Sequence, residues 1–241
     1  MILVFIYDQI YGRDIALQYL YFVISQTPTR FGGIVRKLGK VKYNHASVSL
    51  DPKLTKMFAF GRLQHNTLLL AWLMPEHLHR FTLRKYKNVD CTIFRIPVSE
   101  EQYDKVCNTI TTIGNDPQYM YNYLSVLLFP IFCGFEVYKS YSCIEFVMHI
   151  LNDDLQLPTE KRLCSYTPDD LLKMLSSYVY YSGNLIEYIK NSHPSGESDM
   201  KYISAEAEKK YFGPMTWNLF WKSFAAVFII IGRNLSFKRR A

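Results

Sequence analysis

The segment CIEFVMHIL, residues 143–151, constrains the fold most strongly, because it is apolar on almost every side. A helix of this kind is stable only where other elements cover most of its surface. The chain has 241 residues, of which 49% are hydrophobic and 20% are charged, so it is long enough to supply that cover. The sequence therefore predicts a folded domain with a buried helix, and it excludes a disordered or collagen-like chain.

Short segments rich in β-branched and aromatic residues predict a small, mostly antiparallel sheet. Within residues 42–51 the side chains alternate between two faces. One face carries Tyr43, His45, Ser47 and Ser49. The other predicted strands cover residues 2–7, 56–62 and 92–98. With the helices this gives an α+β fold, and the aromatic content of 16% agrees with strands and large buried rings.

Helical spacing and end signals predict helices over residues 14–25, 29–40, 99–114, 143–151 and 167–175. Ser99 and Gln102 form a capping box at the start of the third of these, and Gly114 ends it. The expected organisation is a main domain over residues 1–185, a linker or surface excursion over 186–210 and a C-terminal helical appendage over 211–241.

The net charge of +7 is unevenly distributed. Residues 201–241 contain eight basic and two acidic residues, so +6 of the net charge lies there and the first 200 residues carry only +1. A nearly neutral main domain disfavours nucleic acid as a partner, because nucleic-acid binding depends on clustered positive charge.

The basic C-terminal segment also carries an aromatic helical face. Its members are Trp217, Phe220, Trp221, Phe224 and Phe228. Residues 224–231 form an unbroken apolar run that is shorter than the ~20 residues needed to span a membrane. Two interpretations stay open: an interfacial helix on an anionic membrane surface, or a helix packed on the domain or on a partner subunit.

Cysteine usage and the N-terminal sequence indicate a reducing compartment. The five cysteines are odd in number and none has CxxC spacing, which disfavours a zinc ribbon, a thioredoxin-type site and a disulfide scaffold. The first residues lack the basic start of a signal peptide, so we expect a cytoplasmic protein, either free or peripheral on a membrane. His77 and His79 lack a completing ligand set, and no glycine-rich phosphate loop is present, so we expect neither metal nor cofactor.

Cys143 and His45 are the residues best suited to nucleophilic chemistry. Cys143 follows Ser142 and begins the apolar helix, where the helix dipole favours the thiolate. His45 lies on a predicted strand among small side chains, so that another element can pack close to it and use it as a base. The alternative is that both are ordinary core residues.

Five short strings occur along the chain in the order NHASVSLD, FAFGR, YMYNYLSVL, YSCIEFVMHIL and LCSYTPDDLL. Together, over roughly residues 29–175, they resemble the circularly permuted papain-like cysteine hydrolases, the YiiX-like and lecithin-retinol-acyltransferase-like branch of the NlpC-type superfamily. In that permuted order the histidine strand precedes the cysteine helix. The resemblance implies a permuted papain-like fold, with Cys143 as nucleophile, His45 as general base and an acyl-enzyme intermediate.

The resemblance is weakest at the residue that orients the histidine. The family usually places a polar side chain on the strand after the histidine strand, where this chain has Ala59. Gln64, Glu76 or a backbone carbonyl are the candidates to replace it, and Glu76 is the better chemically because a carboxylate stabilises imidazolium. Tyr121 resembles the tyrosine that often lines such a site, although a core role is equally compatible. Ser142, Tyr43 and Ser47 complete the expected substrate pocket.

The leading functional hypothesis is a cysteine-dependent hydrolase or acyl transferase that acts on an amide or ester of a peptide-like or acyl substrate. The first rival is a lipid-directed acyltransferase or phospholipase with the same catalytic pair, which the aromatic and basic C-terminal segment favours. The second rival is a catalytically silent binding or membrane-tethering module, which Ala59 favours. The sequence does not decide the oligomeric state.

Overall fold

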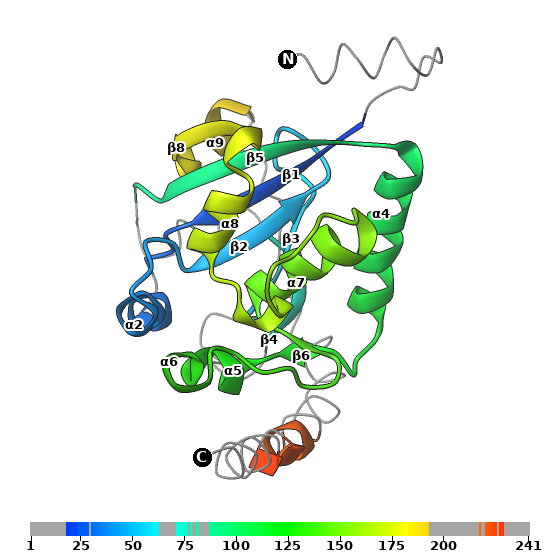
Figure 1. Ribbon diagram of the computed structural model, residues 1–241. Coiled ribbons are helices and arrows are strands. Elements are labelled where there is room, and N and C mark those ends of the chain that lie inside the picture. The colour runs from blue at the N-terminus through cyan, green and yellow to red at the C-terminus, as the bar shows by residue number, and fades with distance from the viewer. Residues whose placement is uncertain are drawn as a thin grey trace, which may run out of the picture.

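The computed structural model describes residues 18–28, 30–62, 71–76, 78, 81, 87–192, 217, 220–225 and 227–228 (Figure 1). Its main feature is a six-stranded antiparallel sheet with the strand order β4-β3-β2-β1-β5-β8. The strands are β1 (Gln18–Ser25), β2 (His45–Ser49), β3 (Met57–Arg62), β4 (Ala71–Glu76), β5 (Asp90–Val98) and β8 (Val179–Asn184). A separate parallel pair joins β6 (Met120–Tyr121) to β7 (Ser140–Tyr141).

Helices occupy both sides of this sheet and one end of the molecule. They are α2 (Arg30–Gly39), α4 (Glu100–Asn115), α5 (Tyr123–Leu127), α6 (Phe129–Phe132), α7 (Cys143–His149), α8 (Pro168–Met174) and α9 (Leu185–Ser192). A π-helical turn, Ile150–Asp154, continues α7, and short 3-10 turns cover Leu163–Ser165 and Ser176–Tyr178. The architecture is therefore mixed α and β, as expected.

Two hydrophobic clusters explain why the sheet is stable. On one face Leu20, Phe22 and Val48 pack with Phe146 and Val147 of α7, and α4 and α8 cover the same cluster. The other face is covered by α9, whose buried side chains pack with those of β1 and β5. Because α7 packs on β2 and β3, its first turn is held against the centre of the sheet (Figure 1).

The prediction of a helix over residues 14–25 is wrong within the described part of the chain. Residues Gln18–Ser25 form β1, the strand between β2 and β5. Leu20 and Phe22 face one cluster, while Tyr21 and Val23 face the other. A strand buried on both faces is apolar throughout, and a continuous apolar run does not distinguish a strand from a buried helix.

The other predicted elements within the described residues are confirmed, although Gly114 does not end its helix, which continues to Asn115 and is capped by Asp116. The predicted strands over residues 42–51, 56–62 and 92–98 correspond to β2, β3 and β5, and the helices over 29–40, 99–114, 143–151 and 167–175 to α2, α4, α7 and α8. Residues 2–7 lie outside the described part. Strands β4 and β8 were not predicted, and α9 extends the packed domain to residue 192, past the expected boundary at 185.

The described residues from Trp217 to Phe228 are helical, as the sequence predicts for the C-terminal segment. In the part of the chain that the structure describes, no helix combines the length and hydrophobicity needed to cross a bilayer.

Candidate active site

A capping box fixes the start of α7 and thereby places Cys143. The Ser142 hydroxyl accepts a hydrogen bond from the Glu145 backbone N–H at 3.3 Å, and Glu145 Oε2 accepts one from the Ser142 N–H at 2.6 Å. Cys143 is consequently the first residue of a buried helix, and only 5% of its surface is exposed. This confirms the predicted position of the cysteine.

The histidine is held by a carboxylate from another strand. His45 Nε2 lies 2.8 Å from Glu76 Oε1, and Glu76 is fully buried at the end of β4. The other oxygen of Glu76 accepts a hydrogen bond from the Ser47 hydroxyl. With Nε2 engaged by the carboxylate, Nδ1 is the ring nitrogen left to interact with the thiol of Cys143, whose pKa His45 lowers.

The packing of the sheet explains how Cys143 reaches the beginning of β2. Within the described residues, β2 and β3 are in register only at Val48 with Phe58 and at Ser49 with Met57. Helix α7 packs against β2, and the backbone N–H of Ala46, near the start of this strand, is one of the groups that lower the pKa of Cys143. The thiol is therefore influenced by backbone as well as by side chains.

These contacts change the pKa of both members of the pair. Burial lowers the pKa of His45, but the charge of Glu76 and the hydrogen bonds to Cys143 and Glu76 outweigh it and raise that pKa to about 9. Burial raises the pKa of Cys143, but hydrogen bonding and charge from His45, the Ala46 N–H and the Tyr121 hydroxyl bring it below its ordinary value. Both directions favour a thiolate–imidazolium pair near neutral pH.

Tyr121, the last residue of β6, and Asn122, which follows it, support the cysteine. Burial raises the pKa of Tyr121 well above its ordinary value, so Tyr121 is a neutral phenol, and its interaction with Cys143 lowers the pKa of the thiol. Asn122 Nδ2 donates to the Phe135 carbonyl at 2.9 Å and to Glu145 Oε1 at 3.3 Å. Asn122 thus connects the tyrosine strand to the capping box of α7.

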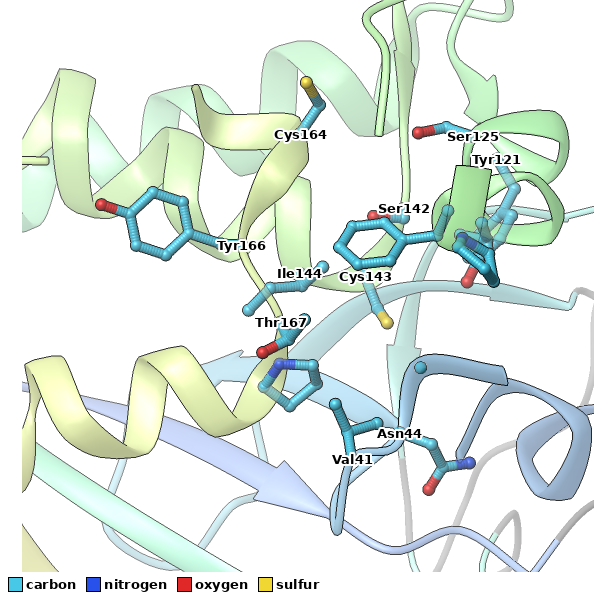
Figure 2. Close-up of a pocket in the computed structure, with 15 residues that line it drawn as sticks. Val41, Asn44, Tyr121, Ser125, Ser142, Cys143, Ile144, Cys164, Tyr166 and Thr167 are labelled. Atoms are coloured by element: carbon cyan, nitrogen blue, oxygen red, sulfur yellow. The ribbon is translucent and has the colours of Figure 1, made fainter. Parts of the chain in front are cut away.

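An open cleft lies beside the cysteine and encloses about 590 Å³ of empty space, open solvent included (Figure 2). No charged residue is found among the described residues that line it. Its apolar lining consists of Val41, Tyr121, Val126, Phe129, Pro130, Ile144, Tyr166 and Pro168. Figure 2 shows the Cys143 sulfur directed toward the side of the cleft that carries Val41 and Asn44, whereas the Cys164 sulfur points away from it.

Most of the predicted site residues come together. His45 contacts Glu76 and lowers the pKa of Cys143, and Tyr121 and Ser142 line the cleft beside Cys143. Ser47 contacts Glu76, so it supports the carboxylate from behind.

Three predicted residues have another outcome. Ser47 was expected in the substrate pocket, but it is buried against Glu76 and does not line the cleft. The Tyr43 hydroxyl lies 3.1 Å from Thr92 Oγ1 on β5, and the side chain packs in the core, so it does not belong to the pocket. Gln64 lies outside the described residues. Ala59 is buried on β3, as expected, and Glu76 of the adjacent β4 provides the polar group that this strand lacks.

Asn122 was not predicted as a site residue. The one available signal was its position directly after Tyr121 and ahead of an apolar stretch, since Asn is a preferred N-cap residue. In the structure its side chain indeed caps α5, by accepting from the Ser125 N–H.

Comparison of the chain with family models, with curated proteins and with solved structures gives no match. The interpretation of the site therefore depends on its own geometry.

Proposed function

We propose that this protein is a cysteine-dependent hydrolase or acyl transferase with a permuted papain-like arrangement, in which Cys143, His45 and Glu76 form the catalytic group. The observation that carries the proposal is the fully buried Glu76 carboxylate 2.8 Å from His45 Nε2, on a histidine that lowers the pKa of the buried Cys143 thiol. A nucleophile, a base and a group that orients the base are the three parts that thiol catalysis requires.

The proposed reaction begins with attack of the Cys143 thiolate on the carbonyl carbon of an ester or amide. The carbon–sulfur bond forms, and the His45 imidazolium donates its proton to the leaving oxygen or nitrogen as the carbon–oxygen or carbon–nitrogen bond breaks, which leaves a thioester on Cys143. Neutral His45 next removes a proton from water or another acceptor, which attacks the thioester carbonyl. The carbon–sulfur bond then breaks, the acyl group leaves on the acceptor, and the thiolate and imidazolium are restored. Glu76 stabilises the imidazolium form, and the Tyr121 hydroxyl stabilises the thiolate.

The lining of the cleft favours a second, narrower candidate, a lipid-directed acyltransferase or phospholipase. An apolar cleft without charged residues in its described lining suits a hydrocarbon chain better than a charged peptide. The silent-module alternative has less support, because its motivation was the absence of a polar partner for His45, and Glu76 is such a partner.

Incubation with p-nitrophenyl esters of increasing chain length, followed by peptide mass spectrometry, tests the proposal. We expect release of nitrophenol and a transient acyl group on Cys143 in the native chain. The matched control is Cys164→Ala, which removes the other buried thiol of the cleft and leaves the pair intact. The assignment is overturned if Cys164→Ala loses turnover while Cys143→Ala keeps it. It is also overturned if Cys143 is acylated by none of the esters and by none of a series of acyl amides.

A further inference from the structure

The C-terminal helix has two different sides. One side carries Trp217, Phe220, Trp221, Phe224, Val227 and Phe228, and we call this set the aromatic face. Each of its members is between 43% and 68% exposed. The rings contact one another, as in the Trp217–Phe220 pair with centroids 6.1 Å apart and the Phe224–Phe228 pair at 5.0 Å. Such a cluster of exposed large apolar side chains indicates an interaction site.

Lys222 holds the opposite side of this helix on the domain. It lies roughly 160° around the helix from the middle of the aromatic face, at 100° per residue. Its side chain is buried, and Nζ donates to the carbonyl oxygens of Gln118 and Lys139, the latter at 2.7 Å. Lys222 and Ser223 share a small pocket with Tyr123 and Leu124 of α5. The helix is therefore attached to the domain with its polar side inward and its aromatic face outward.

The charge of the segment decides which occupant fits the aromatic face best. Residues 201–241 carry a net charge of +6. Two copies of so basic a segment repel each other, which disfavours a second copy of the chain. An anionic lipid surface supplies both the apolar layer that exposed Trp and Phe side chains enter and the negative charge that Lys and Arg attract.

Apolar surface is also exposed beside the helix, at the same end of the molecule (Figure 1). Leu127 of α5 and Ile131 of α6 are 43% and 70% exposed. Phe129 and Pro130, between them in the chain, line the cleft that leads to Cys143. A membrane in contact with the aromatic face would thus lie on the side of the molecule where Phe129 and Pro130 line the cleft.

We infer that the aromatic face of the C-terminal helix docks on an anionic membrane surface, with the helix lying in the interface and the domain held above it by Lys222. The docking inference is independent of the proposed reaction, because the aromatic face is formed by side chains that are not part of the proposed catalytic group of Cys143, His45 and Glu76. Docking should weaken as the salt concentration rises, since its electrostatic part is screened.

The native tryptophans provide the test. The chain has three, and Trp72 is buried with its Nε1–H donating to the Ile113 carbonyl at 3.2 Å. Any shift of emission on adding vesicles therefore reports on Trp217 and Trp221. The full chain is titrated with phosphatidylcholine vesicles with and without phosphatidylglycerol, and binding is measured by emission and by co-sedimentation.

The variant Phe224→Ser/Phe228→Ser removes part of the aromatic face and keeps both reporters. Its matched control is Val179→Ser/Tyr180→Ser on β8, which removes side chains of similar exposure (45% and 44%) at the other end of the molecule. Circular dichroism checks that each variant retains its secondary structure.

We expect a blue shift and tighter binding with anionic vesicles, and about tenfold weaker binding by Phe224→Ser/Phe228→Ser with the control unchanged. The inference is overturned if the native chain does not bind anionic vesicles, or if both variants bind as it does. A blue shift that grows with protein concentration in the absence of vesicles, together with a dimer in sedimentation velocity, would assign the face to a second copy instead.

Discussion

Two cysteines line the same cleft in different surroundings. Cys143 begins α7 and Cys164 lies in the turn Leu163–Ser165, and both are buried. Burial raises the pKa of Cys164 above its ordinary value, and Arg162 and Ser165 only partly offset that effect. At Cys143 the same effect of burial is outweighed by hydrogen bonding and charge from His45. Burial alone thus makes a thiol less reactive, and a buried thiol becomes a nucleophile only through its partners.

Removal of the histidine should abolish this difference and has the largest expected effect. In His45→Ala the Cys143 thiol keeps its burial but loses the partner that lowers its pKa, so its pKa should rise toward that of Cys164. We expect ester turnover to fall by roughly 10³-fold or more. Stopped-flow assays of nitrophenol release measure this change. The comparison breaks down if turnover survives in His45→Ala while the variant is folded.

Neutralisation of the carboxylate should change the pH dependence of turnover. In the native protein, activity should be lost as the pH falls through the pKa of Cys143 and as it rises past about 9, where His45 loses its proton. Glu76→Gln removes the charge that raises the His45 pKa, so the alkaline limb should move to lower pH. We also expect turnover at the optimum to fall by roughly 10- to 100-fold.

The control for Glu76→Gln is Ser47→Ala, which removes a hydrogen bond to the carboxylate and keeps its charge. If Glu76→Gln keeps the alkaline limb of the native pH–rate profile, Glu76 does not raise the pKa of His45. That result would contradict the proposed role of the carboxylate.

Removal of the tyrosine hydroxyl should have a smaller effect on the same thiol. In Tyr121→Phe the sulfur loses one donor, so the pKa of Cys143 should rise and turnover should fall by about 3- to 10-fold, with the acid limb at higher pH. Tyr166→Phe is the matched control, because Tyr166 lines the cleft while its hydroxyl accepts from the Glu160 backbone N–H at 2.9 Å. Equal pH profiles for the two variants would remove Tyr121 from the site.

The smallest expected effect on turnover concerns Asn122, whose role is to support α7. Asn122→Ala leaves the Phe135 carbonyl and one oxygen of Glu145 without this buried donor. We expect the free energy of unfolding to fall by about 1–3 kcal/mol, as measured by urea titration. The residual folded protein should keep the low pKa of Cys143. A stability equal to that of the native chain would show that the connection is not needed.

Local patterns in the sequence placed the two central residues on their elements, and the order of the five short strings favoured a catalytic role for them. The apolar run that starts at Cys143 predicted a helix beginning there, and alternation along residues 42–51 placed His45 and Ser47 on one face. The helix and strand signals are local, because helical spacing and pleating involve neighbours in the chain.

The remaining features depend on contacts between distant segments. Glu76 contacts His45 only because β4 pairs with β3 and β3 pairs with β2, so the sequence left it as one of several candidates. The strand alternation that was predicted over residues 42–51 does not include Tyr43, because β2 begins only at His45. The backbone N–H of Tyr43 instead donates to Asp169 at 3.1 Å. Strand β1 was predicted as a helix because helices on both faces of the sheet make it apolar throughout.

The most direct test of the proposed ion pair is the rate of alkylation of Cys143 compared with that of Cys164. The native chain is treated with limiting iodoacetamide over a range from about pH 5 to pH 9, and each cysteine peptide is quantified by mass spectrometry. We predict that Cys143 reacts faster than Cys164 already near pH 6, and that His45→Ala removes this advantage. If both thiols gain reactivity only at alkaline pH and at the same rate, Cys143 is an ordinary buried thiol and the proposed catalytic pair does not exist.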